Sequence, residues 1–310
     1  MKVRLALLLS ALLGGCVPVP LARPAVATES SCGCGPVDRL GRWSEDGVES
    51  VLAGDLQHGR VHVIVHGWAP GWHAHVDEST RSWEAERRGE PFDPWMHALA
   101  RGLTARDPHA VVLFYSWVDD AATSSNLFAQ RRAFSRTDLH GELLAEGLDR
   151  ALDPGFRSRG GQVHLVGHSF GARVVTLAAT QMGTPPDHLT LLDAPEGGLA
   201  AMTATRVALG DSLRSLPLGH GPGRVFVDNF ISQMGVPYGH EPGLTDVVDV
   251  HTAPPYGVFQ MGPRHVWAAE LYARSASTDF GVGWSPLIAD ASPAGCFTQP
   301  FGELTVHPGC

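Results

Sequence analysis

Lysine is almost absent from this chain of 310 residues, because Lys2 is the only one it contains. Lysine and arginine together number 23, Asp and Glu number 32, and the net charge is −9 with histidine neutral. No long basic run occurs either. Phosphate binding requires clustered positive charge, so this composition argues against nucleic acid as a partner.

A hydrophobic run long enough to span a bilayer is also lacking. Leu5–Leu13 is apolar and follows Lys2 and Arg4, but it is too short for a stable anchor, which is typical of an export signal. The run ends in Leu-Gly-Gly-Cys16, which resembles the lipobox of bacterial lipoproteins and would make Cys16 the lipidated residue and membrane anchor. Cleavage after Ala25-Val26-Ala27 is the alternative. The sequence thus predicts a cell-envelope lipoprotein or a secreted protein.

Cysteine is scarce, and either processing route leaves four cysteines in the folded part: Cys32, Cys34, Cys296 and Cys310. An even number in an exported protein indicates two disulfides. Cys32 and Cys34 are too close for an easy mutual bond, so we expect each to pair with one C-terminal cysteine. A metal site made of these four is the alternative.

The chain divides by composition into four parts. We expect residues 1–15 to be the signal, 16–39 a Pro- and Ala-rich tether, 40–290 one folded domain and 291–310 a C-terminal tail. An apolar fraction of 44% suffices for a full core.

Short apolar runs alternate with helical patterns along the domain. The expected strands are Arg60–Val65, Ala110–Trp117, Gln162–Val166, His188–Leu192, Arg224–Phe230 and Thr245–Val250. The expected helices are Phe92–Leu103, Phe128–Leu152, Phe170–Met182 and Val266–Ser275. This alternation predicts an α/β fold with a mostly parallel sheet covered on both faces, whose active site lies beyond the carboxyl ends of the strands. The Gly- and Leu-rich stretch 195–223 suits a lid beside that site.

The strongest chemical signal is Gly167-His168-Ser169-Phe170-Gly171, a G-x-S-x-G pattern. Here it follows an expected strand and opens an expected helix, which is the setting that a nucleophile elbow requires. Glycines flank the serine because the turn is too tight for side chains, and the serine hydroxyl is exposed on a strained backbone. Ser169 is therefore the candidate nucleophile.

Further motifs follow in a recognisable order: HGW at 66–68, VLFYSW at 112–117, VHLVGHSFGA at 163–172, LTLLDAP at 189–195 and RHVWAAELYARS at 264–275. Together they resemble the α/β-hydrolase superfamily, and within it the group typified by pancreatic lipase, over roughly residues 60–275. The resemblance implies the α/β-hydrolase fold and a Ser-acid-His triad that hydrolyses carboxylic esters without metal or organic cofactor. It also implies that Trp68 and Phe170 supply the backbone N–H groups of the oxyanion hole.

The general base must come late in the chain. His265 precedes an expected helix, and the spacing to Tyr272 resembles the helix opening that places the histidine in the lipase-like relatives. His251 is the alternative, but Thr252-Ala253-Pro254-Pro255 offers no helix to brace it.

Two aspartates are candidates for the acid. Asp193 ends an expected strand, and LLDAP resembles the segment that carries the acid in pancreatic-type lipases. Asp228 lies in or at the end of the next strand, after which many other α/β-hydrolases place their acid, although it could equally be a buried structural carboxylate.

Histidines also form one pattern unrelated to a triad. His73-Ala74-His75-Val76-Asp77 matches the start of a binuclear metal motif, but Glu78 replaces its last histidine, so we expect no metal there.

The function predicted is a serine esterase or lipase acting on a small-molecule or lipid ester. An amidase or peptidase on the same fold and a catalytically silent binding lipoprotein are the alternatives.

Overall fold

The computed structural model describes residues 39–57, 59–69, 73–76, 83–87, 90–91, 94–121, 127–195, 209–232, 244–252, 254 and 261–277. The predictions for Cys16, Cys32, Cys34, Cys296 and Cys310 lie outside these residues, as do the signal, residues 16–38 of the tether, the tail and 196–208 of the expected lid. Arg39, which we assigned to the tether, is instead fully buried. None of the described helices has the combined length and hydrophobicity of a membrane span.

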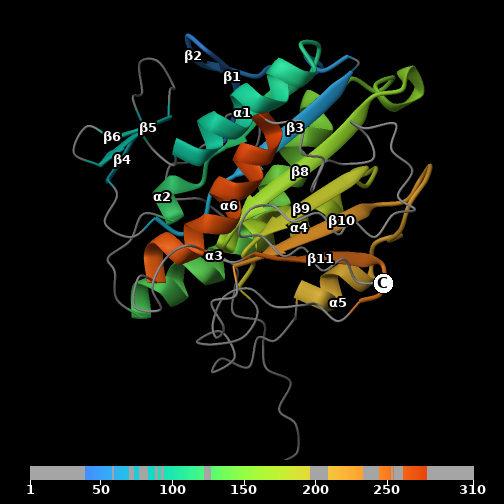
Figure 1. Cartoon of the computed structure of the whole chain (residues 1–310). Coiled ribbons are helices and arrows are strands. Elements are labelled where there is room, and N and C mark those ends of the chain that lie inside the picture. Colours follow the sequence, from blue (N-terminus) through green and yellow to red (C-terminus); the bar gives the residue numbers. More distant parts are fainter. Residues whose placement is uncertain are drawn as a thin grey trace, which may run out of the picture.

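An eight-stranded sheet runs through the molecule in the order β11-β10-β9-β8-β3-β7-β1-β2 (Figure 1). Its strands are β1 (Leu40–Ser44), β2 (Gly47–Ser50), β3 (Arg60–Val65), β7 (Val111–Tyr115), β8 (Gln162–His168), β9 (His188–Leu192), β10 (Phe226–Ile231) and β11 (Val247–His251). Strands β7, β3, β8, β9, β10 and β11 pair in parallel, whereas β1 is antiparallel to both β7 and β2. A mostly parallel sheet covered by helices on both faces, with the serine turn directly after β8, is the architecture of the α/β-hydrolase fold.

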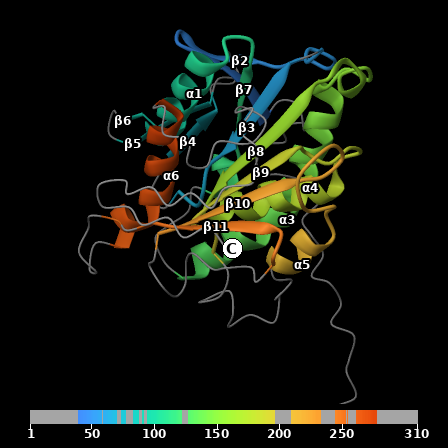
Figure 2. The same ribbon diagram turned by 45° about the vertical axis from the view of Figure 1, so that its right-hand side comes forward.

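Helices cover both faces of the sheet. They are α1 (Pro94–Arg106), α2 (Val118–Ala121), α3 (Leu127–Ala151), α4 (Phe170–Gln181), α5 (Leu209–Arg214) and α6 (Met261–Ser277), with a single 3-10 turn at Arg157–Arg159. Helices α1 and α6 lie side by side on one face in both views, and α3 and α4 lie on the other (Figures 1 and 2). A small antiparallel sheet contains β4 (His73–Val76), β5 (Trp83–Arg87) and β6 (Glu90–Pro91).

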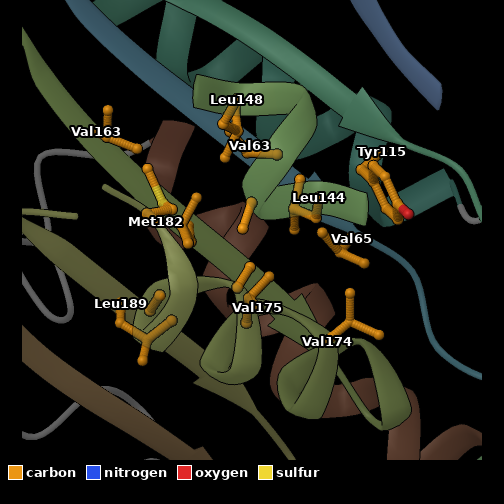
Figure 3. Close-up of a cluster of buried hydrophobic side chains, with 14 of the residues drawn as sticks. Val63, Val65, Tyr115, Leu144, Leu148, Val163, Val174, Val175, Met182 and Leu189 are labelled. Carbon is orange, nitrogen blue, oxygen red and sulfur yellow. The ribbon is translucent and has the colours of Figure 1, made fainter. Parts of the chain in front are cut away.

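The alternation of side chains along β3 explains the two-sided core. Val63 and Val65 point toward α3 and α4, while Ile64 points toward α1 and α6, because successive side chains of a strand face opposite sides. Figure 3 shows valines and leucines from β3, β8 and β9 meeting those of α3 and α4. Since both faces are buried, the strands are near-continuous apolar runs, as the sequence pattern predicts for a parallel sheet.

Two expectations about the elements are corrected. The helix that carries His265 begins at Met261 and not after His265, so this residue lies inside α6. Pro263 is compatible with this position because the first turn of a helix has no intrahelical use for the missing N–H. The sequence analysis also missed β1 and β2, an antiparallel pair at the sheet edge.

Candidate active site

Ser169 stands at the turn between β8 and α4, as the elbow pattern predicts, but only 4% of its surface is exposed, which is less than the elbow pattern leads us to expect. Its backbone has φ 53° and ψ −126°, a strained conformation for a residue with a side chain. The flanking glycines allow the turn, because an added Cβ at Gly167 would lie 2.4 Å from the carbonyl oxygen of Gly171 and one at Gly171 would lie 2.4 Å from that of His66. The Ser169 N–H donates to the carbonyl of Leu192 at 2.9 Å, which ties the elbow to the end of β9.

Asp193 follows directly after β9 and is fully buried. One carboxylate oxygen, Oδ1, accepts hydrogen bonds from the Ser232 N–H at 3.0 Å and from the Ser232 hydroxyl at 2.8 Å. The other, Oδ2, lies in short contact with Nδ1 of His265. Burial by itself would raise the pKa of Asp193, but the bonds from His265 and Ser232 together lower it, so the carboxylate is charged at neutral pH.

The contact with Asp193 therefore fixes the tautomer of His265. Its Nδ1 donates to the Asp193 carboxylate, which leaves Nε2 as the ring nitrogen that can accept a proton. The imidazole is partly exposed, at 16% of its side-chain surface. The other candidate, His251, is the last residue of β11 and lies in register with Ile231.

Asp228 is placed elsewhere. It is the third residue of β10, with its side chain on the face of the sheet, and its Oδ1 accepts from Nε2 of His188 at 3.0 Å. It belongs to a buried polar group that also contains His164 and Thr190. The structure thus pairs His265 with Asp193 and gives Asp228 a different histidine partner.

The His66-Gly67-Trp68 turn packs directly on the elbow. A Cβ at Gly67 would lie 2.8 Å from Cβ of Ser169 and 3.1 Å from the carbonyl oxygen of His168, so only glycine fits there. The rings of Trp68 and Phe170 stack with centroids 6.4 Å apart. The two residues expected to form the oxyanion hole therefore lie beside each other and next to Ser169.

The tautomer of His66 orients this turn. The Trp117 backbone N–H donates to Nε2 of His66 at 3.1 Å, so the proton must be on Nδ1, which donates to the Gly67 carbonyl at 2.8 Å. Burial lowers the pKa of His66 to about 4, which keeps the ring neutral. The Trp117 indole N–H also donates to the His66 carbonyl at 2.8 Å. Because the Gly67 carbonyl and the Trp68 N–H belong to one peptide plane, fixing the first sets the direction of the second.

Two contributors escaped the sequence analysis. Ser232, which holds Asp193, is the first residue after β10, and Trp117 follows β7 closely. Both lie beyond the carboxyl end of a parallel strand, which is the one signal that could have indicated them.

A separate group of possible metal ligands lies next to Trp117, whose ring centroid is 5.4 Å from that of His140. In the part of the chain that the structure describes, only Asp119, Asp120 and His140 bring donor atoms within 4.8 Å of one another. Arg39 donates two bonds of 2.9 Å to Asp119, and Arg136 lies 3.6 Å from Asp120. These guanidinium groups already balance the carboxylates, so the group is an ion-pair network rather than a cation site.

Comparison with known proteins finds matches among solved structures. No family model and no curated protein matches the chain. Among solved structures, it is similar to the NocB thioesterase domain in covalent complex with a fluorophosphonate nocardicin G analog, at 18% identity and a TM-score of 0.33. That similarity covers 70% of this chain and 94% of the other. This identity and TM-score are too low to support a functional argument. The function is therefore inferred from this chain's own geometry, which is that of an α/β-hydrolase fold with a serine at its elbow.

Proposed function

We propose that the protein is a serine hydrolase that cleaves carboxylic esters through Ser169, His265 and Asp193. One observation carries the proposal: a buried, charged Asp193 contacts Nδ1 of His265 beside an elbow whose serine has a strained, positive φ. Strain of this kind persists only where surrounding structure enforces it, and it is concentrated at functional sites.

The roles follow from the hydrogen bonds. Nε2 of His265 takes the proton of the Ser169 hydroxyl as its oxygen attacks the ester carbonyl. Asp193 keeps the ring in the tautomer with Nδ1 protonated and stabilises the imidazolium that forms. The N–H groups of Trp68 and Phe170 bind the oxyanion, and each such donor supplies about 3–4 kcal/mol of transition-state stabilisation.

The second half of the reaction uses the same groups. The imidazolium returns its proton to the leaving alcohol, which departs and leaves an acyl group on Ser169. Water then enters, gives a proton to Nε2 of His265 and attacks the acyl carbonyl. The tetrahedral intermediate collapses, the acid is released, and the serine regains its proton. A lipid ester and an exported location remain proposals that derive from the motif order and the N-terminal sequence.

Labelling with a fluorophosphonate probe tests the proposal. We expect the probe to modify Ser169 in the wild-type protein, and Ser169→Ala to abolish both labelling and hydrolysis of p-nitrophenyl esters while the fold is retained. Ser275→Ala is the matched control, because Ser275 is also buried and its hydroxyl donates to the Tyr272 carbonyl within α6. Ester hydrolysis that persists in Ser169→Ala, or a label that maps to another residue, would reject the assignment.

A further inference from the structure

His168 lies where three segments of the candidate site meet. It precedes Ser169 in the elbow, and its side chain is buried, with 6% exposed. Its Nε2 lies 3.0 Å from the carbonyl oxygen of His265, and the two rings are 4.7 Å apart between centroids. On the other side, a Cβ at Gly67 would lie 3.3 Å from Nδ1 of His168. The same ring therefore also packs on the His66-Gly67-Trp68 turn, named the oxyanion turn for the donor that we assign to Trp68.

The position of the proton on His168 follows from its partner. A carbonyl oxygen can only accept, so Nε2 carries the hydrogen and donates it to His265. Burial, together with the nearby His265, lowers the pKa of His168 to about 3, which leaves the ring neutral over the working range of an enzyme. Its donor is therefore present at every pH at which His265 could act as a base.

The hydrogen bond from His168 to the His265 carbonyl lies near the N-terminal end of α6. Further along the same helix, the Tyr272 hydroxyl lies 3.3 Å from the Thr190 hydroxyl, and Arg106 donates to the Ala276 carbonyl at 3.0 Å. Those contacts hold the middle and the C-terminal end of α6. The His168 bond instead connects the backbone of the proposed base to the residue adjacent to the proposed nucleophile, through a single side chain.

We propose that His168 is a positioning residue, which fixes the spacing between His265, Ser169 and the oxyanion turn by donating a hydrogen bond to the His265 carbonyl. The proposal depends on the triad assignment above, because it gives His168 no bond to substrate. A displacement of a catalytic group by about 1 Å can reduce turnover by about 10²-fold. The loss should appear in kcat, since the bond aligns reacting groups and does not hold the substrate.

Two substitutions separate the hydrogen bond from simple packing. His168→Phe keeps a ring of similar size against Trp95 and Gly67 but removes the donor. His168→Gln keeps an N–H at the position of Nε2 and removes the ring. We expect His168→Phe to lower kcat for p-nitrophenyl esters by about 10²-fold with little change in KM, and His168→Gln to recover most of that loss. The rate of fluorophosphonate labelling at Ser169 should likewise fall in His168→Phe and recover in His168→Gln.

Tyr272→Phe is the control for a purely structural effect. It removes a hydroxyl from the buried contact of α6 with Thr190, so it should lower the melting temperature while kcat stays within about threefold of wild type. If Tyr272→Phe lowers kcat as much as His168→Phe, helix docking in general is responsible and the proposal is wrong.

The remaining outcomes are also decisive. Wild-type kcat in a folded His168→Phe protein overturns the inference, and so does a His168→Gln variant that folds but is no better than His168→Phe. If His168→Phe does not fold, His168→Gln alone still tests the proposal, because it must retain turnover within about tenfold of wild type. A wild-type protein that the probe fails to label at Ser169 would instead refute the proposed function, so the two failures are distinguishable.

Discussion

Replacing Asp193 by Asn should nearly abolish turnover, and the structure shows why the exchange of one atom suffices. Both hydrogen bonds to Oδ1 come from Ser232, whose N–H and hydroxyl donate to it. An asparagine must place its carbonyl oxygen there, because its NH₂ group would otherwise meet the Ser232 N–H, which can only donate. The amide NH₂ then faces Nδ1 of His265, where Oδ2 accepts in the wild type.

Two donors cannot share that contact. His265 avoids the conflict by adopting the other tautomer, with the proton on Nε2 and the lone pair on Nδ1, and it then cannot accept the Ser169 proton. The same exchange in a serine protease triad lowers kcat by about 10⁴-fold, which corresponds to about 5.4 kcal/mol. We expect a loss of that order here. Stability should change less, by about 1–3 kcal/mol, because the amide keeps the Ser232 bonds.

Turnover of a p-nitrophenyl ester and urea unfolding, measured on both Asp193→Asn and Asp228→Asn, test this reasoning. Asp228 is an equally buried carboxylate with a histidine partner, His188, but it lies within β10. Its substitution should reduce stability and leave kcat within about threefold of wild type. A large turnover loss in Asp228→Asn with near-normal Asp193→Asn would refute the assignment, and equal losses would show that the two positions are not functionally distinct.

Three more predictions concern packing, pH and the chain ends. Gly67→Ala should reduce kcat by about 10²-fold, since the added Cβ would lie 2.8 Å from Cβ of Ser169; unchanged esterase kinetics would contradict the close approach. Burial lowers the pKa of His62 from 6.5 to about 3, so below pH 6.5 the unfolded chain binds more protons than the folded protein. The free energy of unfolding therefore decreases as the pH is lowered. At pH 5 this residue accounts for a loss of about 2 kcal/mol, at about 1.4 kcal/mol per pH unit. Because His66 and His168 also have lowered pKa values, urea unfolding at pH 7 and pH 5 is compared between the wild type and His62→Phe. An equal loss of stability in both proteins would show that His62 is not buried as a neutral ring. Cys32 and Cys34 should pair with Cys296 and Cys310, each bridge adding roughly 4–5 kcal/mol. Non-reducing peptide mapping of the purified protein decides this, and four free thiols would exclude it.

The sequence contained enough to predict the sheet, because buried parallel strands are continuous apolar runs. Strand β9 coincides with the predicted His188–Leu192, and the elbow lies between a strand and a helix as its glycines require. The edge strands β1 and β2 were missed, since Gly47–Ser50 is largely exposed and polar, without the apolar run that marks the central strands.

The choice between the two aspartates depended on a register that the sequence does not contain. The predicted strand Arg224–Phe230 begins two residues earlier than β10, so Asp228 could be taken for a residue near the strand end. In the structure, Asp228 lies within β10 and its side chain projects from the face of the sheet, whereas Asp193 follows the last residue of β9. The contact of Asp193 with His265 joins residues 72 positions apart, and only the three-dimensional course of α6 brings them together.

Ser169 and Asp193 are also the described non-glycine residues with positive φ, at 53° and 48°, and the bond from the Ser169 N–H to the Leu192 carbonyl joins the two bends. Each such backbone conformation costs about 1–3 kcal/mol. A glycine would adopt either bend without strain, but it would also remove the side chain to which we assign the chemistry. Selection for thermal robustness and selection for turnover therefore act in opposite directions at these two positions. Laboratory selection for stability alone would therefore favour changes at the two residues to which we assign catalysis.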